Sequence, residues 1–330
     1  MMEVHDGAEL CFPQLLNTSC RKPLISWSDA VFLCFLLSSV SVLTVSLNLL
    51  VIVSISHFRQ LHKPTNLLLL SMSFSDFIVG FVFMPGEILR KTSCWFLGDL
   101  FCSLYIYFAA IALCSSVGNI VLISVDRYVI ICDPLHYPTR VTVRRVKLFI
   151  SLCWLCSNFY SSYLVKDDSL QKDKYFSCYG ECVLLVDYTL AYVDLVLSFI
   201  APVTIIVVLY VRVFVVAVSQ ARAMRSHITA VTLQHSVTVT SRKSELKAAR
   251  TLGVLVAVFL MCFIPYYCVS FAAGNILNSS YGILVPCLFC FNSCLNPLIY
   301  ALFYPWFRRA VKLIVTLQIL QPGSCEANVL

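Results

Sequence analysis

The chain has 330 residues, of which 59% are hydrophobic and only 12% are charged, and its formal net charge is +7. Soluble domains carry about 25% charged and about 45–50% apolar residues, so this chain is far more apolar than a soluble protein. The composition therefore predicts a polytopic membrane protein. It argues against a cytosolic enzyme, a nucleic-acid-binding protein and a disulfide-rich secreted domain.

Seven segments are long and apolar enough to cross a bilayer, which takes about 20 residues of helix. They lie near residues 29–56, 66–89, 101–126, 146–165, 187–215, 248–273 and 281–303. No internal repeat of the kind found in many transporters is visible, and an odd number of spans disfavours one. The expected fold class is an all-α membrane protein: a seven-transmembrane helix bundle with a short cytoplasmic amphipathic helix.

Lysine and arginine are unequally distributed between the two sides of the bilayer. If residues 1–28 and every second loop lie on one side, that side carries seven basic residues and the other side the remaining 17 of 24. Basic residues are enriched in cytoplasmic loops, so the N-terminus is expected to be extracellular. The outer side also carries 11 of the 17 acidic residues, which predicts an acidic outer face that attracts cations.

Two further features support this orientation. Asn17 and Asn278 each begin a glycosylation sequon, and both fall on the outer side. Disulfides persist outside the cell, and six of the 17 cysteines lie there, namely Cys11, Cys20, Cys94, Cys102, Cys178 and Cys182. Residues 1–28 lack a continuous apolar core, so the first span is expected to act as its own insertion signal.

The chain is expected to have three parts. An extracellular N-terminus covers residues 1–28, a seven-transmembrane domain covers 29–304, and an amphipathic helix with a cytoplasmic tail covers 305–330. Segment 305–318 is too short and too basic to span a membrane, so we expect it to lie on the inner surface.

Ionisable residues inside spans are costly and indicate functional sites. Asp76 and Asp194 are two such acids. Arg127, at the inner end of the third span, needs a carboxylate partner, and Asp126 and Glu245 are the two candidates.

Each span carries one characteristic residue or short motif, and these occur in the order that is typical of a known receptor family. The set is Asn48, Asp76, Asp126-Arg127-Tyr128, Trp154, Pro202, Pro265 and Asn296-Pro297-Leu298-Ile299-Tyr300. It resembles the rhodopsin-like G-protein-coupled receptors over most of the chain. The seventh-span signature from Asn292 to Phe307, the loop 178–182 and the segment 247–252 resemble the trace amine-associated receptors within that family.

The resemblance implies two disulfides on the outer side. Cys102 would pair with Cys182 and fasten the second outer loop over the pocket, and Cys20 would pair with Cys178 and tie down the N-terminus. Two cysteines are left over, Cys11 and Cys94, and their connectivity does not follow from the sequence.

The resemblance also implies a polar cluster in the middle of the bundle that holds a sodium ion in the inactive receptor. Hard cations prefer such oxygen ligands, which would come from Asp76, Asn48, Ser116, Asn292, Ser293 and Asn296. The alternative is a water-filled polar core without a resident ion. No other cofactor is expected.

On the inner side, Arg127 paired with Glu245 would resemble the lock between the third and sixth spans. Agonist would then bias a two-state equilibrium by binding the open state better. The expected switch residues are Asp126, Arg127, Tyr128, Glu245, Tyr210, Phe263, Asn296, Pro297 and Tyr300. The basic inner loops would receive a heterotrimeric G protein of the stimulatory type, although orientation in the bilayer is their simpler role.

The sequence departs from the usual aminergic pattern at three positions. Ala109, seven residues after Cys102, replaces the acid that commonly binds the amine. Cys290 stands in place of an aromatic residue on the seventh span, and Phe263 replaces the switch tryptophan of the sixth. Alone, these departures argue against amine recognition.

Asp194 changes that interpretation. It lies eight residues before Pro202, which is about 12 Å towards the outside at 1.5 Å per residue. Related receptors face the ligand there, and some fish olfactory members resemble this arrangement. We expect Asp194 to be a relocated amine anchor; the alternative is that it pairs with an internal polar group or stays protonated.

Other residues are expected around the ligand. Ala109 and Leu113 would face the pocket from the third span. Tyr266 and Tyr267 would offer ring faces to a cation, or else serve as packing.

A second acid would favour diamines or polyamines. Asp187 lies seven residues before Asp194, on the same helix face. Glu87 on the second span and Glu181 in the outer loop are the other candidates. The alternative for each is a solvated loop charge.

Together these features predict a plasma-membrane receptor for amine odorants that signals through a stimulatory G protein and cAMP. The alternative is a receptor of the same fold for a non-amine or peptide ligand, with Asp194 structural. A channel or transporter is more remote. No enzymatic activity and no nucleic-acid partner are expected, because the sequence lacks a nucleophile motif or metal-ligand spacing.

Overall fold

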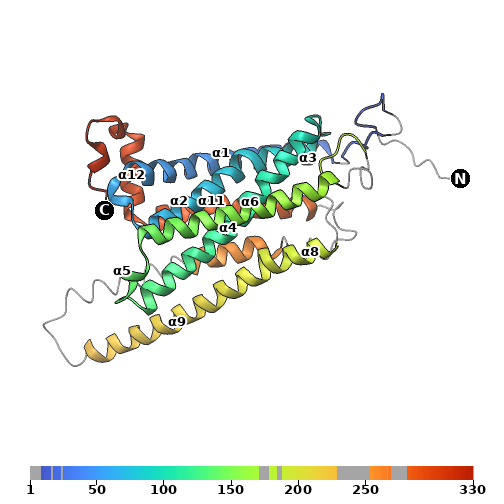
Figure 1. Cartoon of the computed structure of the whole chain (residues 1–330). Coiled ribbons are helices and arrows are strands. Elements are labelled where there is room, and N and C mark those ends of the chain that lie inside the picture. The colour runs from blue at the N-terminus through green and yellow to red at the C-terminus, as the bar shows by residue number, and fades with distance from the viewer. Residues whose placement is uncertain are drawn as a thin grey trace.

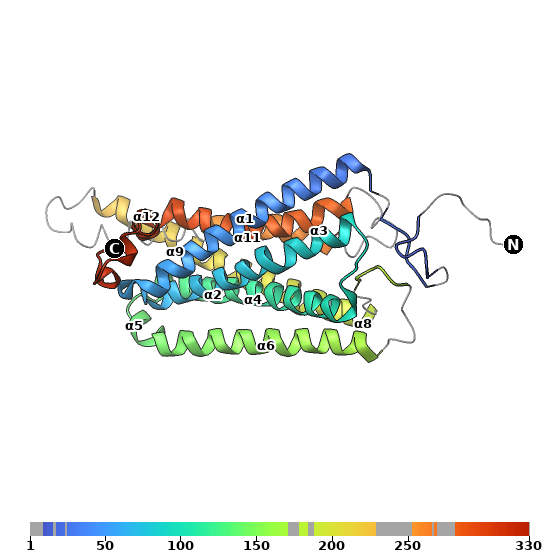
Figure 2. The ribbon, with the colours of Figure 1, turned by 90° about the horizontal axis from the view of Figure 1, so that it is seen from above.

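The computed structural model describes residues 9–15, 18–23, 25–170, 178–183, 188–228, 253–265, 267–268 and 281–329. Within these residues the chain is helical, with two isolated β-bridges as its only β structure. The long helices run side by side along one axis (Figure 1), and a view turned by 90° shows the same elongated bundle (Figure 2). The described N-terminal residues and the C-terminal helices lie at opposite ends of it.

The helices follow one another along the described parts of the chain. The bounds are α1 Trp27–His57, α2 Pro64–Ile78, α3 Met84–Thr92, α4 Gly98–Cys132, α5 Tyr137–Arg140, α6 Val143–Leu170, α8 Tyr188–Asp194, α9 Ala201–Ile228, Gly253–Pro265, α11 Tyr281–Phe303 and α12 Pro305–Val315. Three single turns of 3₁₀ helix are η1 Arg59–Leu61, η4 Gln318–Leu320 and η5 Ser324–Glu326.

Two spans contain a wider, π-helical turn. η2 covers Val79–Phe83 between α2 and α3, and η3 covers Leu195–Ile200 between α8 and α9. Each turn lies just before a proline, Pro85 and Pro202 respectively. Proline cannot donate to the preceding turn and its ring crowds it, and the extra residue of a π turn relieves both effects.

Each predicted span corresponds to a described helix, which confirms the predicted helix bundle. Five continuous helices are long and apolar enough to cross a membrane on their own. A sixth span begins within α11, and the chain then bends by 103° into α12. The apolar helix Gly253–Pro265 lies where the remaining span was predicted, next to segments outside the described residues.

The bundle is apolar outside and partly polar inside, the reverse of a soluble protein. Large side chains such as Phe35, Phe159 and Leu302 are more than 70% exposed, at 74%, 75% and 72%. Asn48, Asp76 and other polar residues are fully buried between the helices. Exposed apolar surface on this scale requires a lipid environment, which agrees with a membrane-spanning chain.

The C-terminal segment folds back against the last turn of the first helix. In α12, Trp306 and Phe307 are buried while Arg308 and Arg309 are exposed, so the helix is amphipathic as predicted. After it, the tail packs against the end of α1. His57 and Ser324 share a hydrogen bond of 2.9 Å there.

Candidate ligand-binding site and receptor switch

The end of the bundle that is predicted to be extracellular carries a cross-linked cap, which we define as residues 9–15, 18–23, 93–97 and 178–183. Three disulfides hold it together. Two are the pairs expected from the resemblance, Cys20–Cys178 and Cys102–Cys182, and the third joins the two leftover cysteines as Cys11–Cys94. The backbone N–H of Trp95 also donates to the carbonyl of Gly180 at 2.8 Å. The N-terminus is therefore tied to both the first and the second outer loop.

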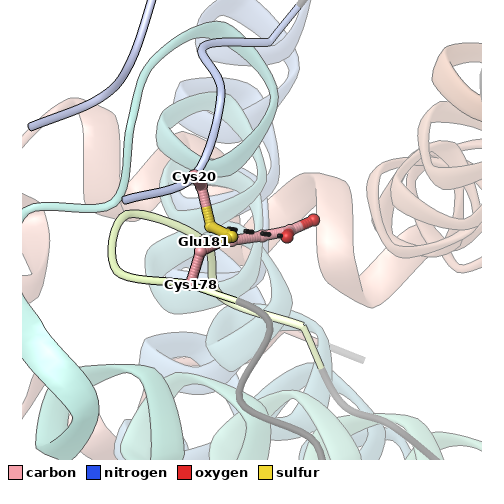
Figure 3. Close-up of side chains that lie close together, drawn as sticks. All are labelled: Cys20, Cys178 and Glu181. Atoms are coloured by element: carbon pink, nitrogen blue, oxygen red, sulfur yellow. Dashed lines mark hydrogen bonds between the residues drawn. A yellow bond between two sulfur atoms is a disulfide. The ribbon is translucent and has the colours of Figure 1, made fainter. Parts of the chain in front are cut away.

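Glu181 lies beside one of these disulfides (Figure 3). Its Oε2 atom is 3.8 Å from the Sγ atom of Cys20. A disulfide sulfur has no proton to donate, so the approach is a contact rather than a hydrogen bond. Cys20 and Cys178 also lack the thiolates that bind metals, so this group of three close side chains is not a metal centre.

Asp194 is the last residue of α8 and is partly buried. Its Oδ1 atom accepts a hydrogen bond of 2.5 Å from the hydroxyl of Tyr160 on α6 and one of 2.9 Å from the hydroxyl of Ser198. The thiol of Cys114 on α4 lies beside the same group. Within the described residues, Oδ2 receives no hydrogen bond and no cationic side chain pairs with this carboxylate.

A carboxylate has about four acceptor positions, and the two hydroxyls occupy only one oxygen of Asp194. Neutral donors orient the group without cancelling its charge. The arrangement is therefore a carboxylate held in place at the junction of three spans, with no cationic partner among the described residues. Sequence reasoning missed Tyr160, because no local spacing links it to Asp194, and it missed Ser198, although a residue four positions on is a usual helical neighbour.

The sequence predicts that Glu87 is either an acid facing the ligand or a solvated loop charge. The structure shows neither. Glu87 is only 3% exposed. Arg90 donates to both of its oxygens, at 2.9 and 3.0 Å, and the hydroxyl of Tyr105 donates to Oε1 at 2.5 Å. Gly86 makes this possible, because a Cβ atom there would lie 2.3 Å from the Tyr105 ring. The carboxylate is fully paired and is not open to a ligand amine.

The other residues that were expected around the ligand lie in different surroundings. Ala109 and Leu113 on α4 are partly buried, and Leu113 packs against the main core. Tyr267 is buried with its ring stacked on Phe199 at 4.4 Å between centroids, so packing covers one of its faces. Five predicted residues lie outside the described part of the chain, namely Asn17, Asp187, Glu245, Tyr266 and Asn278.

The six residues of the expected mid-bundle cluster are all buried and come from four helices. Asn296 donates to Oδ2 of Asp76 at 2.9 Å, and Ser116 donates to Ser75 at 3.0 Å. Oxygen atoms remain that accept no hydrogen bond from the described residues, on Asp76, Asn48 and Asn292. Buried polar atoms normally have partners, and this surplus of oxygen acceptors suits a hard cation or ordered water.

At the inner end, Arg127 lies 3.5 Å from the carboxylate of the adjacent Asp126. Asp126 also accepts hydrogen bonds of 2.9 Å from Thr65 on α2 and Tyr137 on α5. Burial, together with the negative charge of Asp126, raises the pKa of Tyr137 to about 12. The phenol therefore remains a hydrogen-bond donor at neutral pH, and it joins the inner loop to the third span.

The remaining switch residues pack in the core. Tyr300 is fully buried, and its hydroxyl lies 3.3 Å from the sulfur of Met72. The ring of Phe263 packs against that of Phe259 at a tilt of 32°, with ring centroids 4.2 Å apart. Tyr210 lies so close to Gly253 that a Cβ atom there would be 2.1 Å from its hydroxyl. Tyr300 thus connects the seventh span to the second, and Tyr210 lies against the sixth span.

A helix bundle with a buried polar centre, an Asp-Arg-Tyr sequence at its inner end and a disulfide-fastened outer cap defines a seven-transmembrane receptor. Residues 47–300 match the family described as 7 transmembrane receptor (rhodopsin family). The chain is 35% identical to trace amine-associated receptor 13c of Danio rerio, with 98% of this chain and 97% of the relative covered. It is 38% identical to trace amine-associated receptor 6 of Homo sapiens (98% and 96% covered) and 37% identical to receptor 7e of Mus musculus (98% and 92%).

The chain therefore belongs to the trace amine-associated receptors of the rhodopsin family. It is a multi-pass G-protein-coupled receptor of the plasma membrane, whose partners are a small ligand and a heterotrimeric G protein. Members of this family are receptors and not enzymes, in agreement with the sequence-based expectation, and the alternative of a channel or transporter is wrong.

Proposed function

We propose that this receptor binds amine odorants through Asp194 and raises cAMP through a stimulatory G protein. The observation that carries the proposal is a partly buried carboxylate that has two hydroxyl donors and no cation among the described residues. An uncompensated charge in a low-dielectric site is costly, and a ligand ammonium would remove that cost. The relatives' printed name, trace amine-associated receptor, supports the same ligand class.

The third span offers no competing anchor, since Ala109 has no charge. Asp194 instead stands opposite Cys114 on that span and is held by Tyr160 and Ser198. Because these contacts already orient the carboxylate, less conformational entropy is lost when a ligand binds. A carboxylate that is held on one oxygen, and whose other oxygen has no partner among the described residues, is suited to a single strong contact with an ammonium group.

A diamine or polyamine needs a second acid for its second ammonium. Glu87 cannot serve, because Arg90 already occupies both of its oxygens. Glu181 is exposed on the cap, and Asp187 lies outside the described residues. We assign the second contact to one of these two outer acids.

We also propose that the cap faces the outside of the cell and that the mid-bundle cluster holds a sodium ion in the inactive receptor. The bias of basic residues towards the opposite end supports the orientation, as do the disulfides at this end. The unpaired oxygens of Asp76, Asn48 and Asn292 support the ion. Sodium should weaken agonist binding to the wild type and leave Asp76→Asn unaffected; an equal effect on both would favour the water-filled alternative.

The test of the amine anchor is a dose–response series in a cAMP reporter assay with mono-, di- and polyamines and their neutral alcohol analogues. Asp194→Asn keeps the shape and removes the charge, and it should raise the half-maximal concentration at least about 30-fold. Asp99→Asn removes an exposed acid at the start of α4 and should have no effect. Surface expression must be equal in all variants.

One observation favours a second candidate, a receptor of the same fold for a non-amine ligand. Tyr160 and Ser198 already occupy one oxygen of Asp194, as a purely structural carboxylate would require. In that case the neutral compounds would activate the receptor, and Asp194→Asn would reduce expression without changing ligand preference. Ala109→Asp then provides a further distinction, because it should shift the preference among amines only in an amine receptor.

A further inference from the structure

The oxygen atoms around Asp194 can accept further hydrogen bonds but cannot donate any. Oδ1 of Asp194 accepts from the hydroxyl of Tyr160 on α6, at 2.5 Å, and from the hydroxyl of Ser198 on η3, at 2.9 Å. An ionised carboxylate has no proton to give, so both hydroxyl groups must be the donors. Each hydroxyl has then used its only proton, and its oxygen can only accept.

Three oxygen atoms with free acceptor capacity therefore lie close together. One is Oδ2 of Asp194, which receives no hydrogen bond from the part of the chain that the structure describes; the others are the hydroxyl oxygens of Tyr160 and Ser198. The remaining neighbour is the thiol of Cys114 on α4, and a thiol is only a weak donor. The cluster thus has a surplus of lone pairs and a shortage of protons.

Burial makes this imbalance matter for ligand binding. Ser198 is only 7% exposed, and Asp194, Tyr160 and Cys114 are partly buried. In such surroundings, an acceptor that faces a methyl group instead of an N–H group loses a hydrogen bond that water does not fully replace. The number of N–H groups on the cationic nitrogen of the ligand should therefore decide how well it is bound.

We propose that this site selects primary ammonium groups over tertiary and quaternary ones, an inference that rests on Asp194 being the amine anchor. A primary ammonium group carries three N–H groups, one for Oδ2 and one for each hydroxyl oxygen. A tertiary ammonium group carries one and a quaternary group none, so their substituents face the hydroxyl oxygens instead. Tyr160 and Ser198 are then specificity-determining residues, in addition to holding the carboxylate in place.

The aromatic residues of the site agree with this selection. Quaternary ammonium groups are typically recognised by the faces of several aromatic rings. Tyr160 directs its hydroxyl at the carboxylate. The ring of Tyr267 is buried and stacks on Phe199 with centroids 4.4 Å apart, which covers one of its faces. The described neighbours of Asp194 therefore suit N–H groups better than methyl groups.

The test is a dose–response series in a cAMP reporter assay with hexylamine, 2-phenylethylamine and 1,6-diaminohexane. Each is compared with its derivatives methylated at every nitrogen to the secondary, tertiary and quaternary stage, all of which are cationic at neutral pH. The half-maximal concentration should rise about tenfold for each N–H group lost, and so about 100-fold from primary to tertiary amine.

Three variants separate hydrogen bonding from simple lack of space. Tyr160→Phe and Ser198→Ala each remove one acceptor oxygen without adding bulk, and each should narrow the ratio between primary and tertiary amine about tenfold. Tyr107→Phe removes a hydroxyl that donates to Asn158 and should leave the ratio unchanged. Surface expression is measured for every variant, and the ratio within one variant does not depend on how much receptor is present.

The outcomes distinguish this inference from the proposed function. Tertiary amines as potent as their primary parents, with Asp194→Asn still weakening both, would overturn the selection and leave the anchor in place. A ratio that stays the same in Tyr160→Phe and Ser198→Ala would show that methyl groups are excluded by size, and would remove the role of the two hydroxyls. A receptor that responds to none of these amines would overturn the proposed function and this inference together.

Discussion

The two ends of the bundle are held together by different kinds of interaction. The outer end has three disulfides and a partly buried ion pair between Glu87 and Arg90. The inner end has hydrogen bonds of 2.9 Å around Asp126 and an ion pair of 3.5 Å to Arg127. Disulfides make the outer end a covalently fixed frame, whereas the inner end relies on hydrogen bonds from hydroxyl groups to the charged Asp126, each worth about 1.5–3 kcal/mol. A ligand can therefore move the inner end through a modest difference in affinity between two states.

The largest expected effect comes from breaking the ion pair of the outer frame. Glu87→Gln leaves the Arg90 charge without its partner, and the loss should be about 3–5 kcal/mol of stability. Thermal unfolding of the purified receptor measures it. The double variant Glu87→Gln/Arg90→Gln should recover part of the loss, and equal stability of the single and double variants would show that the pair is not part of the frame.

The next effect comes from the unexpected disulfide. Replacing Cys11 and Cys94 together by serine opens a crosslink between positions 83 residues apart and should cost about 2–4 kcal/mol of local stability in the cap. Amide hydrogen exchange of residues 9–15 and 93–97 should rise, while exchange in α4 and α6 should not. Uniform change across the bundle would show that the cap is not a separate unit.

A smaller effect is expected at the amine anchor. Tyr160→Phe removes the hydrogen bond of 2.5 Å to Asp194, and a hydrogen bond to a charged group contributes about 1.5–3 kcal/mol. The half-maximal amine concentration should rise about tenfold, which is about 1.4 kcal/mol. Tyr107→Phe is the matched control, because its hydroxyl, on α4, donates at 3.0 Å to Asn158 on α6, two residues before Tyr160, and does not touch Asp194. Equal shifts in both variants would mean that the packing around α6, not the anchor, was disturbed.

The smallest effect is expected at the inner end. Tyr137→Phe removes one donor to Asp126 and should raise ligand-independent cAMP about fivefold, which is about 1 kcal/mol. The pKa of Tyr137 is raised from 10.0 to about 12, so its contribution is complete below pH 10 and is lost as the pH rises towards 12. The purified wild type should therefore lose stability between pH 10 and 12 more steeply than Tyr137→Phe. Parallel curves would contradict this role.

The spans and the helix after them could be predicted because hydropathy depends on residues that are close in the sequence. The six residues of the mid-bundle cluster are all buried, in agreement with their place in the family pattern. Cys20–Cys178 and Cys102–Cys182 followed from the resemblance alone, and only the structure pairs Cys11 with Cys94. Local patterns thus identify elements and motifs, but not contacts that lack a motif.

The surroundings of the two outer acids could not be predicted, because each lies close to a π turn. η2 precedes Glu87 and η3 follows Asp194. One extra residue turns the rest of a helix by about 100° relative to a regular count. A count at 1.5 Å per residue therefore gives the depth of Glu87 or Asp194 but not its direction. The ion pair to Arg90 and the contact with Tyr160 depend on that direction.

The cap also sets the order in which the receptor can mature. Cys11 and Cys20 are synthesised early, but Cys20 pairs with Cys178, 158 residues later, and Cys11 pairs with Cys94. With the cap on the extracellular side, as we propose, the N-terminal segment must wait in the oxidising lumen until four spans have been inserted and the second outer loop has been delivered. A chain without residues 9–23 would leave Cys94 and Cys178 as unpaired thiols at the outer surface, exposed to mispairing during secretion.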